Sequence, residues 1–332
     1  MNTMYRVLQA AKLDPVFREK LEEKGFQVDV KPGIGRRELL EVIGGYDVLV
    51  VRSRPIVDRE LLQRGRRGRL RLVVRAGVGL DNIDLEAARE LGVAVENTPG
   101  ASTQSVAELV LGLMVSVTRN LVLLHNRVSS GEWSIEYGYE LAGKTLAIIG
   151  FGRIGRRVAA LARAIGMKVV AHDILDLEKE ARALGAEFTG DLCTALRRGH
   201  IVSLHVPLTP LTRHMINKET LECFKRGAIL INASRGPVVD SQALLEALEN
   251  GALAGAGLDV LEHEPPETEA EKKLLKHPRV VATPHIGAST REAQRRVAVA
   301  AALKVLRILG ECPIRIPVRL KREKPIRESV GL

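Results

Sequence analysis

Residues 145–155 read TLAIIGFGRIG, an apolar run that ends in the pattern G-x-G-x-x-G. A helical pattern follows over residues 156–165, and after it comes a second apolar run. This order of strand, glycine-rich turn, helix and strand is typical of a dinucleotide-binding unit. Gly150 permits the tight turn, Gly152 lets a pyrophosphate approach the backbone, and Gly155 lets the helix pack close to the strand. The stretch therefore predicts a cofactor site at the start of the helix, where the N-terminus favours an anion.

An acid, Asp173, ends the second apolar run at about the spacing expected of the residue that contacts the ribose. Its carboxylate would accept hydrogen bonds from the adenosine ribose hydroxyls and repel a 2′-phosphate. We therefore expect the cofactor to be NAD rather than NADP.

The alternation of apolar runs and helical stretches continues on both sides of the glycine-rich turn. A chain of 332 residues is long enough for two cores. We predict an α/β protein with two doubly wound parallel-sheet domains. A long helical pattern follows His285 and can return to the first domain. We thus expect a discontinuous, flavodoxin-like substrate-binding domain of residues 1–99 plus 288–332, with an NAD-binding Rossmann domain of residues 100–287 inserted into it.

Composition excludes several classes of protein. The chain is 45% hydrophobic and 27% charged with a formal net charge of +10, yet it has no basic patch interleaved with aromatic residues, so we expect no nucleic-acid partner. The N-terminus shows no secretory signal. The apolar stretch Val106–Leu124 is interrupted by Glu108, Arg119 and Asn120, and it predicts a buried helix rather than a membrane span.

Three cysteines, Cys193, Cys223 and Cys312, lack the spacing of metal ligands. We therefore expect no metal site and no disulfide, and a cytoplasmic location.

Three polar residues follow strands of the second series, where ligands of open α/β sheets bind. Arg235 follows AILINAS, Glu264 follows AGLDVLEH, and His285 follows RVVATP. Guanidinium can hold the carboxylate of a small anionic 2-hydroxy or 2-oxo acid, and imidazole can exchange a proton near neutral pH. A carboxylate beside the imidazole would orient it. Spacing alone leaves Glu262 open as that carboxylate in place of Glu264.

The chain resembles the D-2-hydroxyacid dehydrogenase family over nearly all of its length up to about residue 310. The segments that carry the resemblance are VVRSR (50–54), RAGVGLDNIDL (75–85), NTPGASTQSVAEL (97–109), GKTLAIIGFGRIG (143–155), HVPLTPLT (205–212), INASRGPVVD (231–240), AGAGLDVLEHEPP (254–266) and TPHIGAST (283–290). The resemblance implies that Arg235, Glu264 and His285 are catalytic, which favours Glu264 over Glu262.

The resemblance also implies binding residues. Beyond the three glycines and Asp173, the implied cofactor contacts are Arg153, Ile154, His205, Pro207, Thr212, Ala233, Asp259 and Gly287. For the substrate, the backbone amides of Val78 and Gly79 would hold the carboxylate, and Arg52, Ser53, Arg235 and His285 would also contact the substrate.

Within the family, the chain is most similar to the members that oxidise D-3-phosphoglycerate to 3-phosphohydroxypyruvate, the first step of serine biosynthesis. Because the chain ends soon after its last helix, we expect no C-terminal serine-binding module. One alternative is a glyoxylate or hydroxypyruvate reductase. An alternative from another class is an NAD-responsive binding scaffold like the corepressors of this fold.

We also expect a homodimer or a dimer of dimers built from the cofactor domain. The apolar helix at 106–124 and the loop that carries Trp133, Tyr137 and Tyr139 exceed what one sheet face needs to bury.

Overall fold

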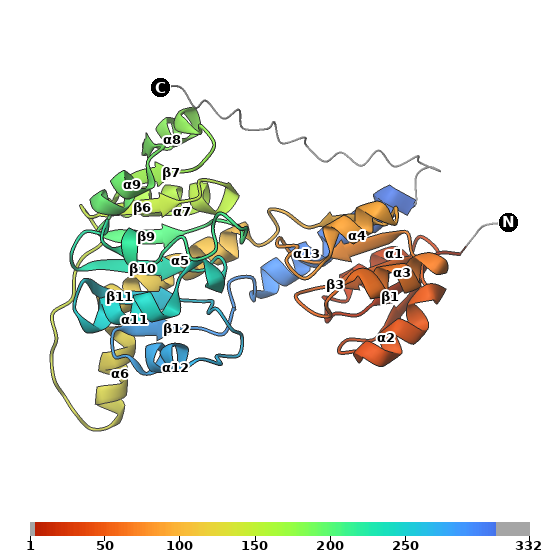
Figure 1. Ribbon diagram of the computed structural model, residues 1–332, viewed down its shortest axis with the longest axis horizontal. Coiled ribbons are helices and arrows are strands. Elements are labelled where there is room, and N and C mark those ends of the chain that lie inside the picture. Colours follow the sequence, from red (N-terminus) through yellow and green to blue (C-terminus); the bar gives the residue numbers. More distant parts are fainter. Residues whose placement is uncertain (1–3, 310–332) are drawn as a thin grey trace, which may run out of the picture. The chain divides into compact units, whose positions relative to one another are not determined.

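The computed structural model describes residues 4–309, which form two compact units. One unit holds residues 4–98 and 298–309, and the other holds residues 99–297 (Figure 1). The first division lies one residue from the position expected from the sequence. The second lies within the last helix, α13 (Arg291–Leu309), rather than at residue 288. The reason is that the start of α13 contacts the second unit, where Arg296 Nε donates to the carbonyl oxygen of Ala101 at 2.9 Å.

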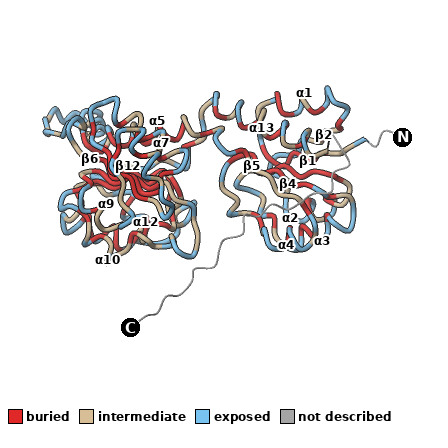
Figure 2. Tube along the Cα trace, turned by 90° about the horizontal axis from the view of Figure 1, so that it is seen from above, coloured by how far each residue is buried: buried red, intermediate tan, exposed pale blue. Residues whose placement is uncertain are grey.

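The first unit is a five-stranded parallel sheet with the strand order β2-β1-β3-β4-β5. Its elements are β1 (Arg6–Gln9), α1 (Val16–Glu22), β2 (Gln27–Val30), α2 (Arg36–Val42), the 3₁₀ helix η1 (Ile43–Gly45), β3 (Val48–Val51), α3 (Arg59–Arg67), β4 (Leu72–Arg75), α4 (Leu85–Glu90), β5 (Ala94–Asn97) and the end of α13. Helices α1 and α13 lie on one face of the sheet and α2, α3 and α4 on the other (Figure 2). The strand order is that of flavodoxin-like folds.

The second unit is a seven-stranded parallel sheet with the order β12-β11-β10-β9-β6-β7-β8. Its strands are β6 (Thr145–Ile149), β7 (Lys168–His172), β8 (Glu187–Thr189), β9 (Ile201–Leu204), β10 (Ala228–Asn232), β11 (Leu253–Leu258) and β12 (Val280–Ala282). The helices are α5 (Thr103–Thr118), α6 (Leu121–Ser129), α7 (Arg153–Ala164), α8 (Glu178–Ala183), α9 (Leu192–Arg198), α10 (Lys218–Leu221), η2 (Gly236–Val238), α11 (Ser241–Glu249) and α12 (Glu269–Lys276). The predicted fold class, two parallel-sheet α/β domains, is confirmed.

Both faces of the larger sheet are covered, as the alternation within β6 shows. Leu146 and Ile148 pack in one apolar cluster with residues of α5 and α7, and Ala147 and Ile149 pack in another with residues of α9 and α11. From β6 the chain continues to β7 and β8 on one side of β6, whereas β9 pairs with the other side of β6. The order in which strands are added to the sheet therefore reverses between β6 and β9. Open α/β sheets bind their ligands at such a reversal.

The predicted apolar helix at 106–124 is two helices rather than one. Helix α5 ends at Thr118, and α6 begins after Asn120, whose φ of 51° lies in the left-handed region. Helix α5 is largely buried, whereas α6 buries none of its residues. Within residues 4–309 no single helix has the length and apolarity of a membrane span. The pair α5 and α6 reaches them only jointly, and it is bent by 61°.

The prediction that no disulfide forms is wrong. Cys193 in α9 and Cys223 just after α10 are joined by a disulfide, with a Cα–Cα distance of 5.3 Å. The two residues are 30 positions apart in the sequence, and only the packing of their segments on the same face of the sheet brings them together. The spacing of the cysteines excludes a metal-binding motif, but it does not reveal whether Cys193 and Cys223 form a disulfide.

Removal of this cross-link is expected to destabilise the second unit. By the chain-entropy model, a disulfide between residues 30 positions apart contributes about 3.6 kcal/mol to the free energy of unfolding. Cys193→Ser should show that loss in urea unfolding, as should the reduced wild type. Cys312→Ser leaves the pair intact and is the matched control. Equal stability of oxidised wild type and Cys193→Ser would contradict the prediction.

Candidate active site

The glycine-rich turn lies at the sheet's reversal point. Gly150, directly after β6, has a φ of 93°, and a Cβ there would collide with the backbone of His205, which follows β9. A Cβ on Gly155 would overlap the carbonyl oxygen of Gly150. Both glycines are therefore required by close packing, and that packing fixes the N-terminus of α7 between β6 and β9.

The third glycine has a different surrounding. Gly152 is the N-cap of α7, and a Cβ built on it meets open space rather than protein. That space lies at the N-terminus of a helix of 12 residues, where Arg153 and Ile154 form the first turn. A helix N-terminus with open space beside it fits a pyrophosphate.

Asp173 lies at the end of the neighbouring strand, β7, and faces the turn. Its Oδ2 accepts a hydrogen bond from the backbone of Phe151 at 2.7 Å, and its Oδ1 accepts one from Leu175 at 3.0 Å. The carboxylate is half-buried. An acid fixed beside the glycine-rich turn fits the ribose of NAD, so the residues present match the predicted cofactor.

Asp173→Ala is expected to relax the choice of cofactor toward NADP. The change removes an acceptor for the ribose hydroxyls and a negative charge that opposes a 2′-phosphate. The ratio of kcat/KM for NADH to that for NADPH should fall by about tenfold or more, which corresponds to about 1.4 kcal/mol. Asp176→Ala removes an exposed acid from the same loop and is the control. An unchanged ratio in Asp173→Ala would show that another residue sets the selectivity.

The loop after β9 carries three of the predicted cofactor contacts. Thr212 Oγ1 donates to the carbonyl oxygen of Pro207 at 2.6 Å, which closes the loop on itself. His205 Nε2 lies 2.9 Å from Ser203 Oγ, and its Nδ1 is buried without a hydrogen-bond partner. Burial lowers the pKa of His205 to about 4. His205 is thus neutral at pH 7 and a poor proton donor for catalysis.

The predicted catalytic residues follow three neighbouring strands. Arg235 comes after β10, Glu264 after β11 and His285 after β12, and these parallel strands are adjacent in the sheet. Their carboxyl ends therefore lie at one edge. His285 Nδ1 is 2.7 Å from Glu264 Oε2, and both side chains are about half exposed. Since a carboxylate only accepts hydrogen bonds, Nδ1 donates, and Nε2 is left to exchange a proton with a substrate.

The turn that carries His285 is held by a buried acid, Asp259. Its carboxylate accepts hydrogen bonds from Thr283 Oγ1 at 2.6 Å and from the backbones of Ile286 at 2.7 Å and Gly287 at 2.8 Å. The backbone N–H of His285 donates to Asp259 O at 2.8 Å, and His285 has a φ of 54°. Strained backbone of this kind persists where its surroundings over-determine it. Asp259 and Gly287 were singled out as cofactor contacts, which stays a prediction; the structure shows them organising the histidine.

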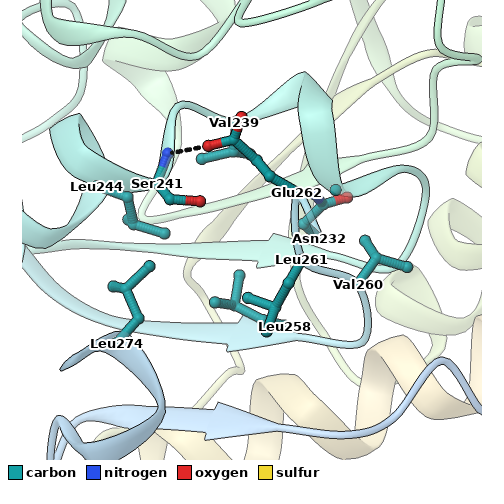
Figure 3. A pocket seen from close by; sticks show the side chains of 10 residues that line it. Asn232, Val239, Ser241, Leu244, Leu258, Val260, Leu261, Glu262 and Leu274 are labelled. Atoms are coloured by element: carbon teal, nitrogen blue, oxygen red, sulfur yellow. Dashed lines mark hydrogen bonds between the residues drawn. The ribbon is translucent and has the colours of Figure 1, made fainter. Parts of the chain in front are cut away.

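The competition between Glu262 and Glu264 is decided by geometry. Glu262 Oε2 lies 2.6 Å from His214 Nε2, and its Oε1 accepts a hydrogen bond from the backbone of Ser241 at 2.8 Å (Figure 3). Glu262 is therefore engaged away from His285. The small pocket in Figure 3 is lined mostly by apolar side chains beneath this contact.

The position of Arg235 is set by the loop after β10 and by its packing on the loop after β11. It is half-buried, and its Nη1 donates to the carbonyl oxygen of Ser234 at 2.7 Å. The next residue, Gly236, packs so closely against Leu261 that a Cβ would overlap the Leu261 carbonyl. The loop that carries Arg235 thus rests directly on the loop that leads to Glu264. Ala233, another predicted cofactor contact, lies at the start of the Arg235 loop.

The predicted substrate residues of the first unit share an edge of its own sheet. Arg52 and Ser53 follow β3, and Val78 and Gly79 follow β4, its neighbour. Asn82 ties down the first loop by donating to the carbonyl oxygen of Arg52 at 2.9 Å. Arg52 is half-buried, and this burial lowers the pKa of its guanidinium.

Sequence reasoning missed Asp259 as a support of His285, and it missed the pairing of Glu262 with His214. The only signal was the position of Asp259 directly after an apolar strand, and such a position does not reveal which backbone groups a carboxylate will accept from.

Comparison with known proteins agrees with this geometry. Residues 111–287 match the model of the D-isomer specific 2-hydroxyacid dehydrogenase, NAD binding domain. The chain is 44% identical over 308 residues to a hydroxypyruvate reductase of Thermotoga maritima, covering 92% of this chain and 99% of the relative. It is 43% identical over 291 residues to a D-3-phosphoglycerate dehydrogenase of Methanocaldococcus jannaschii, covering 87% of this chain and 54% of that one.

Among solved structures, a glyoxylate reductase from Paecilomyes thermophila superposes with a TM-score of 0.84 at 31% identity, covering 93% of this chain and 97% of that one. The chain spans about half the length of the phosphoglycerate dehydrogenase that it matches, but nearly all of the two reductases. With the glycine-rich turn, the acid on β7 and the histidine–glutamate pair in place, the chain belongs to the D-isomer specific 2-hydroxyacid dehydrogenases, which are NAD-dependent oxidoreductases.

Proposed function

We propose that the protein interconverts D-3-phosphoglycerate and 3-phosphohydroxypyruvate with NAD, the reaction that begins serine biosynthesis. The observation that carries the chemistry is the 2.7 Å contact between His285 and Glu264, on the strand edge that also bears Arg235. A base, its orienting carboxylate and a fixed cation are the groups that a 2-hydroxy acid requires.

NAD supplies the acceptor for the hydride that leaves the C2–H bond during oxidation. His285 Nε2 takes the hydroxyl proton as the carbon–oxygen double bond forms, and it returns that proton when the ketone is reduced. Glu264 holds the imidazole through Nδ1, so that Nε2 is the nitrogen left to exchange the proton. Arg235 holds the substrate carboxylate and, in reduction, polarises the ketone.

The choice of a phosphorylated substrate is supported by the first unit. Arg52 is a half-buried cation that precedes Ser53 in the loop after β3, and a guanidinium can donate two parallel hydrogen bonds to a phosphate dianion. Several relatives are named D-3-phosphoglycerate dehydrogenase, from Archaeoglobus fulgidus and Bacillus subtilis among others.

The second candidate is reduction of hydroxypyruvate or glyoxylate. The relative from Thermotoga maritima favours it, since that hydroxypyruvate reductase aligns over 99% of its length. These ketones carry no phosphate, so this candidate gives Arg52 no phosphate to bind.

A steady-state assay of NADH consumption distinguishes the two. We expect kcat/KM to be highest for phosphohydroxypyruvate over hydroxypyruvate and glyoxylate, and Arg52→Gln to lower it at least tenfold more for the phosphorylated ketone. Highest activity on hydroxypyruvate or glyoxylate, with an equal effect of Arg52→Gln on all three, would refute the phosphoglycerate assignment and support the second candidate.

We further propose that the chain forms a homodimer, or a dimer of dimers, through α6 and the loop after it. Trp133 and Tyr137 are 87% and 95% exposed, and α6 buries none of its residues. Such an apolar surface is typical of a protein interface. Wild type should sediment as a dimer or tetramer, and the double variant Trp133→Ser/Tyr137→Ser should shift toward monomer. Leu211→Ser is the control, because it replaces an exposed apolar side chain in a different loop, the one after β9. A wild type that stays monomeric at all concentrations would contradict the proposal.

A further inference from the structure

A carboxylate outside the predicted site lies fully buried beside the loop that carries Glu264. Glu271 is in the first turn of α12, and its side chain has no exposed surface. Its Oε1 accepts a hydrogen bond from the backbone of His263 at 2.7 Å. Its Oε2 accepts from the backbones of Glu267 at 3.1 Å and Thr268 at 2.9 Å, and from Thr268 Oγ1 at 3.0 Å.

Glu271 accepts more hydrogen bonds than the capping of a helix N-terminus requires. Thr268 and Glu271 form a capping box, which uses one backbone donor at the N-cap. The bonds from His263 and Glu267 are additional. Burial raises the pKa of Glu271, but the hydrogen bonds from Thr268, His263 and Glu267 outweigh it, so the pKa is lowered and the group is an anion.

The donors lie on both sides of Glu264. His263 precedes it directly, while Glu267 and Thr268 follow it, so the segment 263–268 is wrapped around the buried carboxylate. Three histidines lie within contact distance of carboxylates in or beside this segment. His263 contacts Glu271, His214 contacts Glu262, and His285 contacts Glu264. Fixing both ends of so short a segment restricts where the Glu264 side chain can lie.

We propose that Glu271 is a positioning residue that holds the 263–268 segment so that Glu264 meets His285. The effect on the reaction rests on the function proposed above, whereas the anchoring of the segment does not. Catalytic groups need supports that fix them within a fraction of an ångström, and a buried carboxylate with several backbone donors is such a support.

The first test replaces Glu271 with Gln, which has the same shape but one acceptor oxygen in place of two. Some of the N–H and O–H groups that donate to Glu271 then face the amide N–H groups of Gln, and the segment 263–268 becomes less firmly held. We expect kcat for ketone reduction to fall about tenfold with KM for NADH changed less than twofold. Glu269→Gln is the matched control, because Glu269 lies in the same turn, is exposed and pairs with Lys272.

A double-mutant cycle separates positioning from a general loss of stability. In a Glu264→Gln background, Glu271→Gln should change kcat less than twofold, because the pair that it positions is already impaired. The same fall in both backgrounds would overturn the proposal, as would an effect no larger than that of Glu269→Gln. If Glu271→Gln does not fold, Thr268→Val removes one donor and should show the same dependence on Glu264.

Hydrogen exchange reads the anchoring without any substrate. The amides of His263, Glu267 and Thr268 should be protected in the wild type and exchange faster in Glu271→Gln, whereas Glu269→Gln leaves them protected. Unchanged protection in Glu271→Gln would overturn the anchoring itself. If wild type reduces no 2-oxo acid but the amides respond as expected, the function proposed above fails while the anchoring stands.

Discussion

His285→Ala is expected to lower kcat for reduction by about 100-fold or more, with little change in the affinity for NADH. In the function that we propose, the imidazole supplies the proton that the reduced oxygen needs, and Nε2 is the nitrogen available because Nδ1 donates to Glu264. Stopped-flow single-turnover reduction measures the chemical step, and fluorescence titration measures NADH binding.

The chain offers a matched control in His214, which shares several features with His285. It has a φ of 49°, is half exposed and pairs with a glutamate, Glu262, at 2.6 Å. His214→Ala therefore imposes similar backbone strain and breaks a similar pair, but it should cost far less in kcat. Near-normal turnover of His285→Ala with NADH still bound would show that another group donates the proton. Burial, which lowers the pKa of His205 to about 4, makes that residue a weak replacement.

Arg235→Ala is expected to affect both binding and turnover. In the proposed function, loss of the guanidinium removes the partner of the substrate carboxylate and the group that polarises the ketone. Breaking a desolvated charge pair costs about 2–5 kcal/mol, so kcat/KM should fall by about 30-fold or more, with KM for the ketone raised and kcat lowered. Steady-state assays over a range of ketone concentrations separate the two.

Two variants sharpen the experiment on Arg235. Arg235→Lys keeps the charge but not the planar fork, and we expect an intermediate loss. Arg226→Ala removes an exposed charge in the same unit and controls for long-range attraction of the anion. If Arg235→Ala raised KM no more than Arg226→Ala, Arg235 would not hold the carboxylate.

Much of this site could be predicted because its residues follow buried strands. Apolar runs such as TLAII and AILIN mark the strands, and the carboxyl ends of parallel strands share an edge, so residues 235, 264 and 285 were expected to lie together. The glycine-rich turn was equally readable, because close packing at Gly150 and Gly155 leaves no room for a side chain.

The features that sequence reasoning missed depend on tertiary contacts. Asp259 and Glu271 accept hydrogen bonds from backbone N–H groups of the loops that carry His285 and Glu264, and every residue type except proline has such a donor, so the sequence cannot reveal these contacts. The disulfide joins residues 30 positions apart, with no pattern between them. The apolar helical pattern continues through Asn120, but the backbone of Asn120 is left-handed and ends the helix there. The spacing of apolar residues does not reveal such a break.

The reaction that we propose for this chain is reduction of a 2-oxo acid to the D-2-hydroxy acid, and its reverse, with the proton exchanged at His285. The most direct measurement is chiral analysis of the hydroxy acid formed from phosphohydroxypyruvate and NADH by wild type and by His285→Ala. We expect D-3-phosphoglycerate from the wild type in step with NADH consumption, and formation about 100-fold slower or more in the variant. An L or racemic product, or a variant as fast as the wild type, would contradict it.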